Sequence, residues 1–492
     1  MPFDLESFSA LCEKISSIDL HGTSLPLPPW GSRLPNRADL SSAIAEGSAL
    51  LPPAYQAGYA QPLRDQLARI EHLARHTTGF AGTVETMIGA VHQQGEGYPH
   101  AAALRRFLAV VSDLYRSFLS ADKRTAAGVR LSELLPPLAT FKYQGDQGPF
   151  TIPVEGTKGI FGGSIGVVSM PAVYRDHPLL WGSLTHEAGG HDVVHADDGL
   201  LDELRAVVLE KCGARGAARG GKASDEQLLG AVWAYWMDEA AADVYGLLNM
   251  GPAYAFNLAA LFSGLNNRGR GGGPCMRTET GASAAHGDLD CHPTDILRLG
   301  LAAGVIDSLR QLSPKTRQAY GEALRQLTAL CAGSATTVRL EGAISLGAAR
   351  LHVATRQPLK KMLETARGVG RLIATTRLQA LGGRGIQEIE TWDDGDERAA
   401  ATIDAALTAG QPIVGLGDAA QVLAGMTHAL SRKPALYDAA TGLVNDALDA
   451  SYHGDPIFGA PAPDPIFVRQ QHWNSAPAAT PLARPSRRRA AR

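Results

Sequence analysis

The segment that most constrains this chain is Leu184–Ala196, which reads L-T-H-E-A-G-G-H-D-V-V-H-A. It places three histidines, a glutamate and an aspartate on one predicted helix, because apolar residues recur at helical spacing just upstream, at Leu179, Leu180 and Leu184. Imidazoles and carboxylates are common ligands of zinc, and two histidines four residues apart on one helix face form a familiar zinc motif. The segment therefore predicts a helical metal site.

The spacing of the first two histidines departs from that motif. His186 and His191 are five residues apart, which would turn the second imidazole past the first on a regular α-helix. A one-residue π-bulge, a local widening of the helix, would return both rings to one face, and such bulges occur mostly at functional sites. Gly189 and Gly190 lie between the histidines, and glycine tolerates backbone distortion. We therefore predict a bulge at these glycines.

A second predicted helix offers a carboxylate ligand. The segment Leu228–Met250 carries an apolar stripe at helical spacing. Within it, Glu239 and Asp243 are four residues apart and share a helix face. Glu239 can bind the metal, and Asp243 can accept the spare ring N–H of a ligand histidine, which fixes the tautomer and orientation of the ring.

Both segments resemble motifs of a known family of zinc peptidases. H-E-A-G-G-H is similar to the H-E-x-x-G-H motif of the dipeptidyl-peptidase III family, and residues 238–243 are similar to its second motif, E-E-x-[RK]-A-[ED]. The chain departs from the second motif at Asp238, where the family has glutamate, and at Ala241, where it has a basic residue. The resemblance covers these two short segments, and the chain is shorter than members of the family.

The resemblance implies a zinc metallopeptidase, a hydrolase with a gluzincin-like site of two histidines and one glutamate. Such a site leaves one coordination position open for water. Glu187, beside the first ligand, is the implied general base that takes the proton of this water. The implied zinc ligands are His186, His191 and Glu239, with Asp243 supporting a ligand histidine.

A rival register exists on the same helix. His191 and His195 have the regular four-residue spacing, and Asp192 would then be the base, one methylene shorter than glutamate. The alternative, which we favour, makes Asp192 and His195 neighbours of a site built on His186 and His191.

The segment after the third ligand is similar to a His-Pro…Arg element of several zinc peptidase families. His292 and Pro293 are expected to open a helix, with proline at an early helical position. The resemblance gives His292 a catalytic role as a donor to the substrate oxygen, and the alternative is that it caps the helix. Arg298 either binds a substrate carboxylate or braces Asp243. A second metal site at Cys275, His286, Cys291 and His292 fits no zinc ligand spacing.

A small β-sheet is predicted just before the metal helix, because residues 140–173 contain β-rich runs punctuated by glycine. In zinc peptidases of this type the edge strand of such a sheet pairs with an extended substrate. We expect Val167–Met170 to be that edge strand, the alternative being an ordinary buried strand.

Composition excludes several classes of protein. The net charge of −3 argues against a general nucleic-acid or membrane-surface binder. The chain contains no apolar run of about eighteen residues, so no membrane span is expected. The first residues lack a basic segment followed by an apolar one, so no signal peptide is expected. Five scattered cysteines indicate reduced thiols. These features favour a cytoplasmic protein that binds neither nucleic acid nor membrane, and the resemblance to zinc peptidases implies a peptide or protein substrate as its partner.

The predicted fold class is α+β and predominantly α-helical, with a zincin-like catalytic core and a small β-sheet. We expect a helical N-terminal region (1–139), the zinc-peptidase core (140–310), a helical C-terminal region (311–453) and a disordered basic tail (454–492).

The last helical region includes two expected strands, Thr336–Leu340 and Pro412–Val414. Val414–Ala420 is similar to a dinucleotide fingerprint but lacks a readable βαβ unit, so a turn opening a helix is expected. Helical periodicity in the N-terminal region covers Phe3–Ile15, Pro53–His76, Ala81–His92 and Ala101–Leu119.

Two other functions remain open at this stage. One is a zincin-like scaffold or binding protein without peptidase activity, against which the presence of Glu187 argues. The other is a metal-dependent enzyme of a different kind, such as an iron oxygenase with two histidines and one carboxylate.

Overall fold

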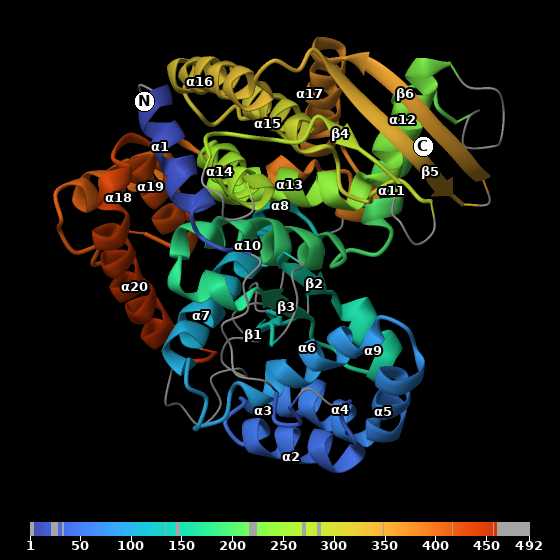
Figure 1. Ribbon diagram of the computed structural model, residues 1–492, viewed down its shortest axis with the longest axis vertical. Coiled ribbons are helices and arrows are strands. Elements are labelled where there is room, and N and C mark those ends of the chain that lie inside the picture. The colour runs from blue at the N-terminus through green and yellow to red at the C-terminus, as the bar shows by residue number, and fades with distance from the viewer. Residues whose placement is uncertain are drawn as a thin grey trace, which may run out of the picture.

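The computed structural model describes residues 4–20, 28–31, 34–132, 134–143, 148–215, 224–267, 272–282, 287–347, 349–415, 417–455 and 457–459. The fold is α+β and predominantly α-helical, as predicted (Figure 1). Most of the predicted basic tail, residues 460–492, lies outside the described residues, as does His286.

The N-terminal part is helical over most of the segments where periodicity predicted it, although the first helix begins at Leu5, after Asp4 as its N-cap, and Phe3 lies outside the described residues. The predicted helix 53–76 is divided by a π-helical turn, Gln56–Ala60, and by a break at Gln66. Helices α2 to α6 and α9 form the lower part of the molecule in Figure 1, whereas α1 lies in the upper part. These helices are α1 (Leu5–Ser16), α2 (Arg37–Ser48), α3 (Pro53–Tyr55), α4 (Gln61–Asp65), α5 (Leu67–His76), α6 (Phe80–His92), α7 (Ala101–Leu119), α8 (Ala121–Ala127) and α9 (Val154–Phe161).

A three-stranded sheet lies at the centre of the molecule, in the order β1-β3-β2. Its strands are β1 (Leu138–Phe141), β2 (Phe150–Ile152) and β3 (Val167–Met170). β3 pairs with β1 in parallel and with β2 in antiparallel register, and it is buried along its length. The prediction that Val167–Met170 is an edge strand is therefore wrong. All four of its residues, including Ser169, are buried between its two neighbours, and β2 is the edge strand on the side of the metal helix.

The helices that follow β3 build the predicted site. The segment Leu228–Met250 is two helices rather than the single one expected. The break is at Trp236, where the backbone departs from helical geometry (ψ 11°). The Trp236 indole N–H donates to the Asp290 carbonyl oxygen at 2.8 Å. The helices are α10 (Leu184–His186), α11 (Leu200–Lys211), α12 (Asp225–Tyr235), α13 (Met237–Met250), α14 (Ala253–Asn267) and α15 (Asp295–Ser308).

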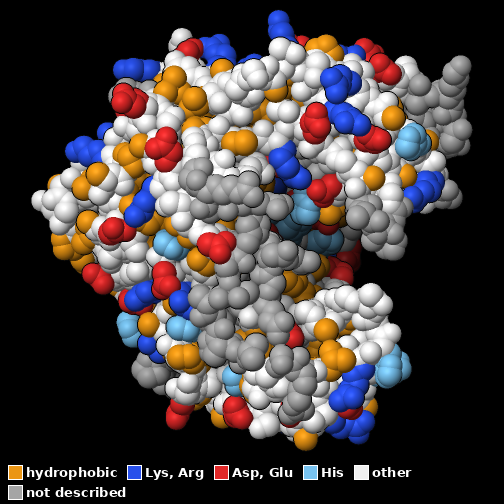
Figure 2. All heavy atoms as spheres, viewed as in Figure 1, with side chains coloured by type: hydrophobic (Ala, Val, Ile, Leu, Met, Phe, Trp, Pro, Cys, Tyr) orange, Lys and Arg blue, Asp and Glu red, His pale blue; other side chains and the backbone are white. Residues whose placement is uncertain are grey.

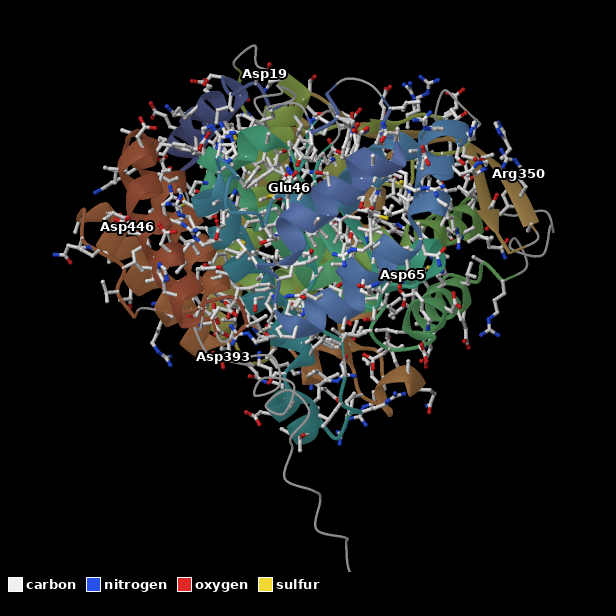
Figure 3. All side chains as sticks on the ribbon, turned by 90° about the horizontal axis from the view of Figure 1, so that it is seen from below. Asp19, Glu46, Asp65, Arg350, Asp393 and Asp446 are labelled. Atoms are coloured by element: carbon white, nitrogen blue, oxygen red, sulfur yellow. The ribbon has the colours of Figure 1, made fainter. Side chains whose placement is uncertain are left out.

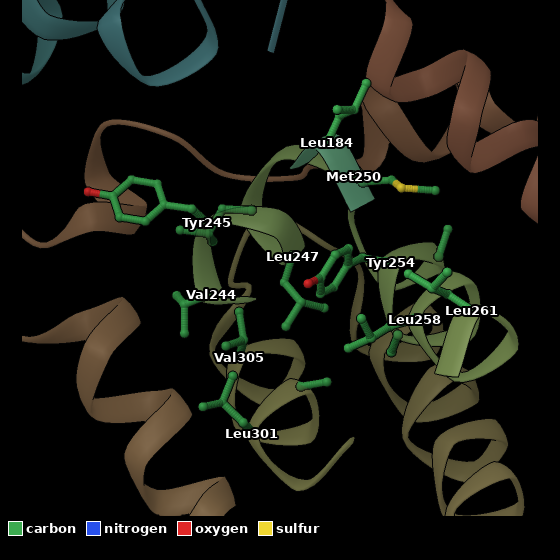
Figure 4. Close-up of a cluster of buried hydrophobic side chains, with 14 of the residues drawn as sticks. Leu184, Val244, Tyr245, Leu247, Met250, Tyr254, Leu258, Leu261, Leu301 and Val305 are labelled. Atoms are coloured by element: carbon green, nitrogen blue, oxygen red, sulfur yellow. The ribbon is translucent and has the colours of Figure 1, made fainter. Parts of the chain in front are cut away.

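Helix α13 is the central helix of the core. All of its residues except Asp238 are buried, including Glu239 and Asp243. Figure 4 shows Val244 and Leu247 of α13 packed near Tyr254 of α14 and Val305 of α15. Burial of each large apolar side chain here contributes roughly 1.5–3 kcal/mol to folding, which fixes the position of the carboxylates on the same helix.

The C-terminal part contains a second sheet, β4-β5-β6, among helices. The strand expected at Thr336–Leu340 is the start of a longer one, its hairpin partner β6 was not predicted, and Pro412–Val414 is not a strand. The turn expected near Val414 does open a helix, with Asp418 as the N-cap of α19. The elements are β4 (Glu279–Thr280), α16 (Pro314–Ala332), β5 (Thr337–Leu346), β6 (Ala349–Pro358), α17 (Leu359–Thr375), α18 (Asp394–Thr408), α19 (Ala419–Arg432) and α20 (Tyr437–Gly454).

The apolar side chains form two clusters of buried residues. The larger one contains most of the helices from α7 onward, and the smaller one joins α2, α5 and α6 to the sheet. Figure 3 shows the charged side chains of Asp446 and Arg350 projecting from opposite sides of the molecule. Within the described part of the chain, no helix has the length and apolarity needed to cross a bilayer.

Candidate metal centre

The predicted π-bulge is present. Residues Glu187–Asp192 form a π-helix that continues directly from α10. The wider turn places the imidazoles of His186 and His191 on one face, with ring centroids 4.6 Å apart and planes nearly perpendicular (88°). The five-residue spacing therefore produces the same juxtaposition that four residues give on a regular helix.

The two glycines of the π-helix are needed for close packing. Neither adopts a left-handed backbone conformation. A Cβ atom on Gly190 would lie 2.8 Å from the Cα and the carbonyl oxygen of Ala242, and one on Gly189 would lie 2.8 Å from the Asn249 amide nitrogen. The glycines thus let the π-helix lie directly against α13, whereas the sequence had suggested only tolerance of distortion.

Glu239 faces both histidines from α13. One carboxylate oxygen lies 3.2 Å from His186 Nε2, and the other lies 3.2 Å from His191 Nε2. The ligand atoms of these three residues all lie within 4.8 Å of one another. Zinc bound tetrahedrally at about 2.0–2.1 Å has ligand atoms roughly 3.3 Å apart, so these positions suit such an ion. Glu239 Oε2 is buried, and Arg298 Nη2 also lies 3.6 Å from it.

Each histidine is oriented by a carboxylate on its other ring nitrogen. His186 Nδ1 lies 3.0 Å from Asp243 Oδ1, the contact expected from the sequence, and His191 Nδ1 lies 3.1 Å from Asp238 Oδ1. Both Nδ1 atoms donate to these carboxylates, so each Nε2 atom is directed at the Glu239 side and, once deprotonated, can bind a metal. The role of Asp238 was missed, because the sequence showed it only as a departure from the family motif.

Asp243 is held by a buried network. Arg298 donates from Nε to Oδ2 at 2.6 Å and from Nη2 to Oδ1 at 2.7 Å, and the Tyr254 hydroxyl donates to Oδ1 at 2.6 Å. Burial alone would raise the pKa of Asp243, but Arg298 and His186 outweigh it and lower the pKa to about 2. Arg298 therefore braces Asp243, the second of the two roles considered, and it is itself 5% exposed.

His292 lies beside this group but outside the helix it was expected to open. Helix α15 begins at Asp295 with Thr294 at its N-cap, so His292 does not cap it. Its Nε2 atom is 3.5 Å from Glu239 Oε1, and its Nδ1 atom is 2.8 Å from Asp290 Oδ1. Partial burial would lower the pKa of His292, but the hydrogen bond to Asp290 outweighs it and raises the pKa. The side chain is half exposed and faces the cleft.

The side chains of the rival register, His191 and His195, do not converge with a third described residue as metal ligands. His195 Nε2 lies 3.6 Å from Asp238 Oδ1, and its Nδ1 lies 3.9 Å from Glu155. Asp192 is buried on the far side of the π-helix, where burial raises its pKa to about 7. Among the described residues, the groups whose ligand atoms converge are His186, His191 and Glu239, and the consecutive residues Asp290, Cys291 and His292.

The metal group opens into a cleft of about 700 Å³. Figure 2 shows this hollow between the upper and lower parts of the molecule, with histidine and acidic side chains at its back. Glu187 lines the cleft and accepts a hydrogen bond from the Thr151 hydroxyl at 2.9 Å. Thr151 lies on β2, and a stripe on α14 forms an apolar wall: Leu258, Leu261, Phe262 and Leu265.

Comparisons with protein-family models, with curated proteins and with solved structures find no match to this chain. The assignment of the site therefore depends on its own geometry.

Replacing Gly190 with alanine should damage the site through packing. The new Cβ would meet the backbone of α13 at Ala242, which cannot rotate away, so α13 and the π-helix must separate. We expect a loss of roughly 1–3 kcal/mol in the free energy of unfolding and a lower zinc affinity. Gly159→Ala on α9 is the matched control, because nothing lies within 4 Å of its added Cβ. Equal melting temperatures for Gly190→Ala and wild type would contradict this packing.

Metal binding should release protons. Burial would lower the pKa of His186 and His191, but the carboxylates on both sides of each ring raise it, so the metal-free rings retain protons to higher pH than free histidine does. Zinc affinity should therefore fall as pH falls, and the stability that these protons give the metal-free protein should be lost as pH rises through the raised pKa values. Calorimetry in buffers of different ionisation enthalpy measures the release, which Asp238→Asn should reduce. A heat of binding independent of the buffer would refute it.

Proposed function

We propose that the chain is a zinc-dependent peptidase. The observation that carries the proposal is a triangle of two imidazoles and one carboxylate with an additional glutamate, Glu187, next to it in an open cleft. Structural zinc sites close the tetrahedron with a fourth protein ligand, whereas catalytic sites keep one position for water or substrate. An acidic side chain that is not a ligand supports hydrolysis over a purely structural role.

Three residues would hold the ion: His186, His191 and Glu239. When bound, zinc supplies a Lewis acid that lowers the pKa of a water molecule and polarises a carbonyl group. Asp243 and Asp238 keep the imidazoles in the tautomer that presents Nε2 to the ion. Two histidines and one glutamate can bind Fe²⁺ as well as zinc. The adjacent Glu187 is the feature that favours a peptidase over an oxygenase.

Glu187 is positioned to move a proton. It is 7% exposed, and the Thr151 hydroxyl fixes its carboxylate from the edge strand. As general base it would take a proton from the attacking water and deliver it to the leaving amine. Thr151 thus acts as a positioning residue that links the base to the strand β2.

The position of the edge strand β2 favours a peptide as the substrate. It pairs with β3 on one side only, and Phe150 and Thr151 line the cleft beside the metal group. An extended peptide can add to such an edge by main-chain hydrogen bonds. The role expected of Val167–Met170 is therefore proposed for Phe150–Ile152. The resemblance to the dipeptidyl-peptidase III family supplies the metal chemistry of the proposal, and release of dipeptides is not part of it.

Glu187→Gln should abolish nearly all peptide hydrolysis while zinc content and melting temperature stay close to wild type. The substitution keeps the shape and the hydrogen bond from Thr151 but removes the proton acceptor. Digestion of a peptide library, with and without chelator, together with metal analysis, measures both effects. Glu155→Gln is the matched control, because Glu155 contacts His195 and no ligand.

The same measurements separate the alternatives. Full turnover by Glu187→Gln would show that the mechanism is wrong. Zinc without hydrolysis in the wild-type protein would favour a scaffold, and iron in place of zinc would favour an oxygenase.

His292→Ala should lower kcat by roughly 10²–10³ with little change in zinc content or KM. The physical reason is that His292 Nε2 points towards the metal group, where it can donate to the negative charge that develops on the substrate oxygen. His352→Ala serves as the control, because His352 is exposed on β6, away from the cleft lining. Loss of zinc would make His292 a ligand, and an unchanged kcat would make it a bystander; either result rejects the assignment.

A further inference from the structure

Helix α14 presents an apolar stripe to the cleft that holds the metal group. Its members are Leu258, Leu261, Phe262 and Leu265, which occupy the i, i+3, i+4 and i+7 positions of one helix face. Leu258 and Leu261, labelled in Figure 4, are 5% and 4% exposed, whereas Phe262 and Leu265 are half-buried. These side chains contain no polar atom, so this wall of the cleft offers no side-chain hydrogen bond to a ligand.

The stripe lies next to the metal group. Tyr254, on the same face of α14 one turn earlier, donates its hydroxyl to Asp243 at 2.6 Å. The guanidinium group of Arg298 lies 3.6 Å from Glu239 and 5.1 Å from the centre of the Phe262 ring. One side chain therefore separates Phe262 from the Glu239 carboxylate, which places the ring beside the part of a substrate nearest the metal.

The opposite face of α14 is packed against the chain itself. Phe256 meets Phe8 of α1 edge-on, with ring centroids 6.3 Å apart, and a Cβ atom on Gly264 would lie 2.7 Å from the Ile15 side chain. This packing fixes the orientation of the helix and keeps the stripe turned towards the cleft. An apolar wall with a few polar groups beside it is typical of a binding site for an apolar group.

We propose that the stripe is a specificity subsite for a large apolar side chain, such as leucine or phenylalanine, next to the scissile bond of a peptide substrate. The inference rests on the proposed peptidase function and names the class of peptide that is cleaved. A peptide extended along β2 directs alternate side chains to opposite sides, and both β2 and the stripe border the cleft. An apolar side chain gains by leaving water at the stripe, whereas a charged one loses its hydration without a partner.

The test compares peptides that differ only in the residues flanking the cleaved bond. Wild-type protein should cleave peptides with leucine or phenylalanine there with a kcat/KM roughly 10–100-fold above that for serine or aspartate. Phe262→Ala should reduce this ratio by roughly tenfold at unchanged zinc content, because it removes the apolar surface nearest the metal. Phe80→Ala is the matched control and should keep the ratio, because Phe80 is half-buried at the start of α6 and does not line the cleft.

Leu261→Ala tests the subsite in the opposite direction and serves if Phe262→Ala does not fold. The smaller side chain deepens the wall, so the kcat/KM for phenylalanine relative to leucine at the flanking position should rise severalfold. A loss of folded protein alone would lower both values equally and leave their ratio unchanged. An unchanged ratio in folded Leu261→Ala and in folded Phe262→Ala would overturn the subsite.

Hydroxamates separate this inference from the peptidase function, because they chelate zinc whether or not the protein hydrolyses peptides. Calorimetry on zinc-loaded protein should give 3-phenylpropanohydroxamic acid a Kd roughly tenfold or more below that of acetohydroxamic acid. Phe262→Ala should remove this difference and Phe80→Ala should keep it.

Peptide cleavage without an apolar preference would overturn the subsite and leave the peptidase function intact. Absence of cleavage together with the expected difference in Kd would overturn the peptidase function and support an apolar subsite at the metal. Absence of cleavage with equal Kd values, or with no binding of either hydroxamate, would overturn both.

Discussion

The contact between the π-helix and α13 is the interaction on which the site depends. Gly190 allows the backbones to approach at Ala242, and this approach places Glu239 between the two imidazoles. A side chain larger than hydrogen would separate the helices and open the ligand triangle. The candidate metal centre is therefore defined by backbone packing as much as by the identity of its three side chains, and the buried apolar face of α13 holds that packing in place.

Electrostatics reinforces the same geometry. Each carboxylate in the centre contacts a nitrogen that opposes the cost of burial: Asp243 contacts Arg298 and His186, and Asp238 contacts His191. The result is a pair of hydrogen-bonded chains that run from the Asp243 and Asp238 carboxylates through the two imidazoles towards Glu239. Such chains fix the orientation of the rings before any ion binds, which reduces the reorganisation required on binding.

Features that depend on local geometry could be predicted from the sequence, whereas features that depend on contacts between distant residues could not. The π-bulge followed from the spacing of His186 and His191, because two rings on one helix depend on local geometry. The break at Trp236 did not follow, since it depends on a bond to the Asp290 carbonyl far along the chain. The edge strand was misassigned for the same reason: strand order is a tertiary property, and the short run Phe150–Ile152 gave little signal beside the apolar β3. The role of Asp238 likewise required the angle between two helices.

The central sheet has a mechanical consequence. Val167 and Ile152 belong to the smaller cluster of buried residues, while Val168 and Met170 belong to the larger one, so the sheet is the partition between two cores. The ligand triangle is anchored wholly in the larger core, whereas β2, the opposite wall of the cleft, is attached in part to the smaller one. A rotation of one core against the other would move β2 and change the width of the cleft. The arrangement of His186, His191 and Glu239 would not change.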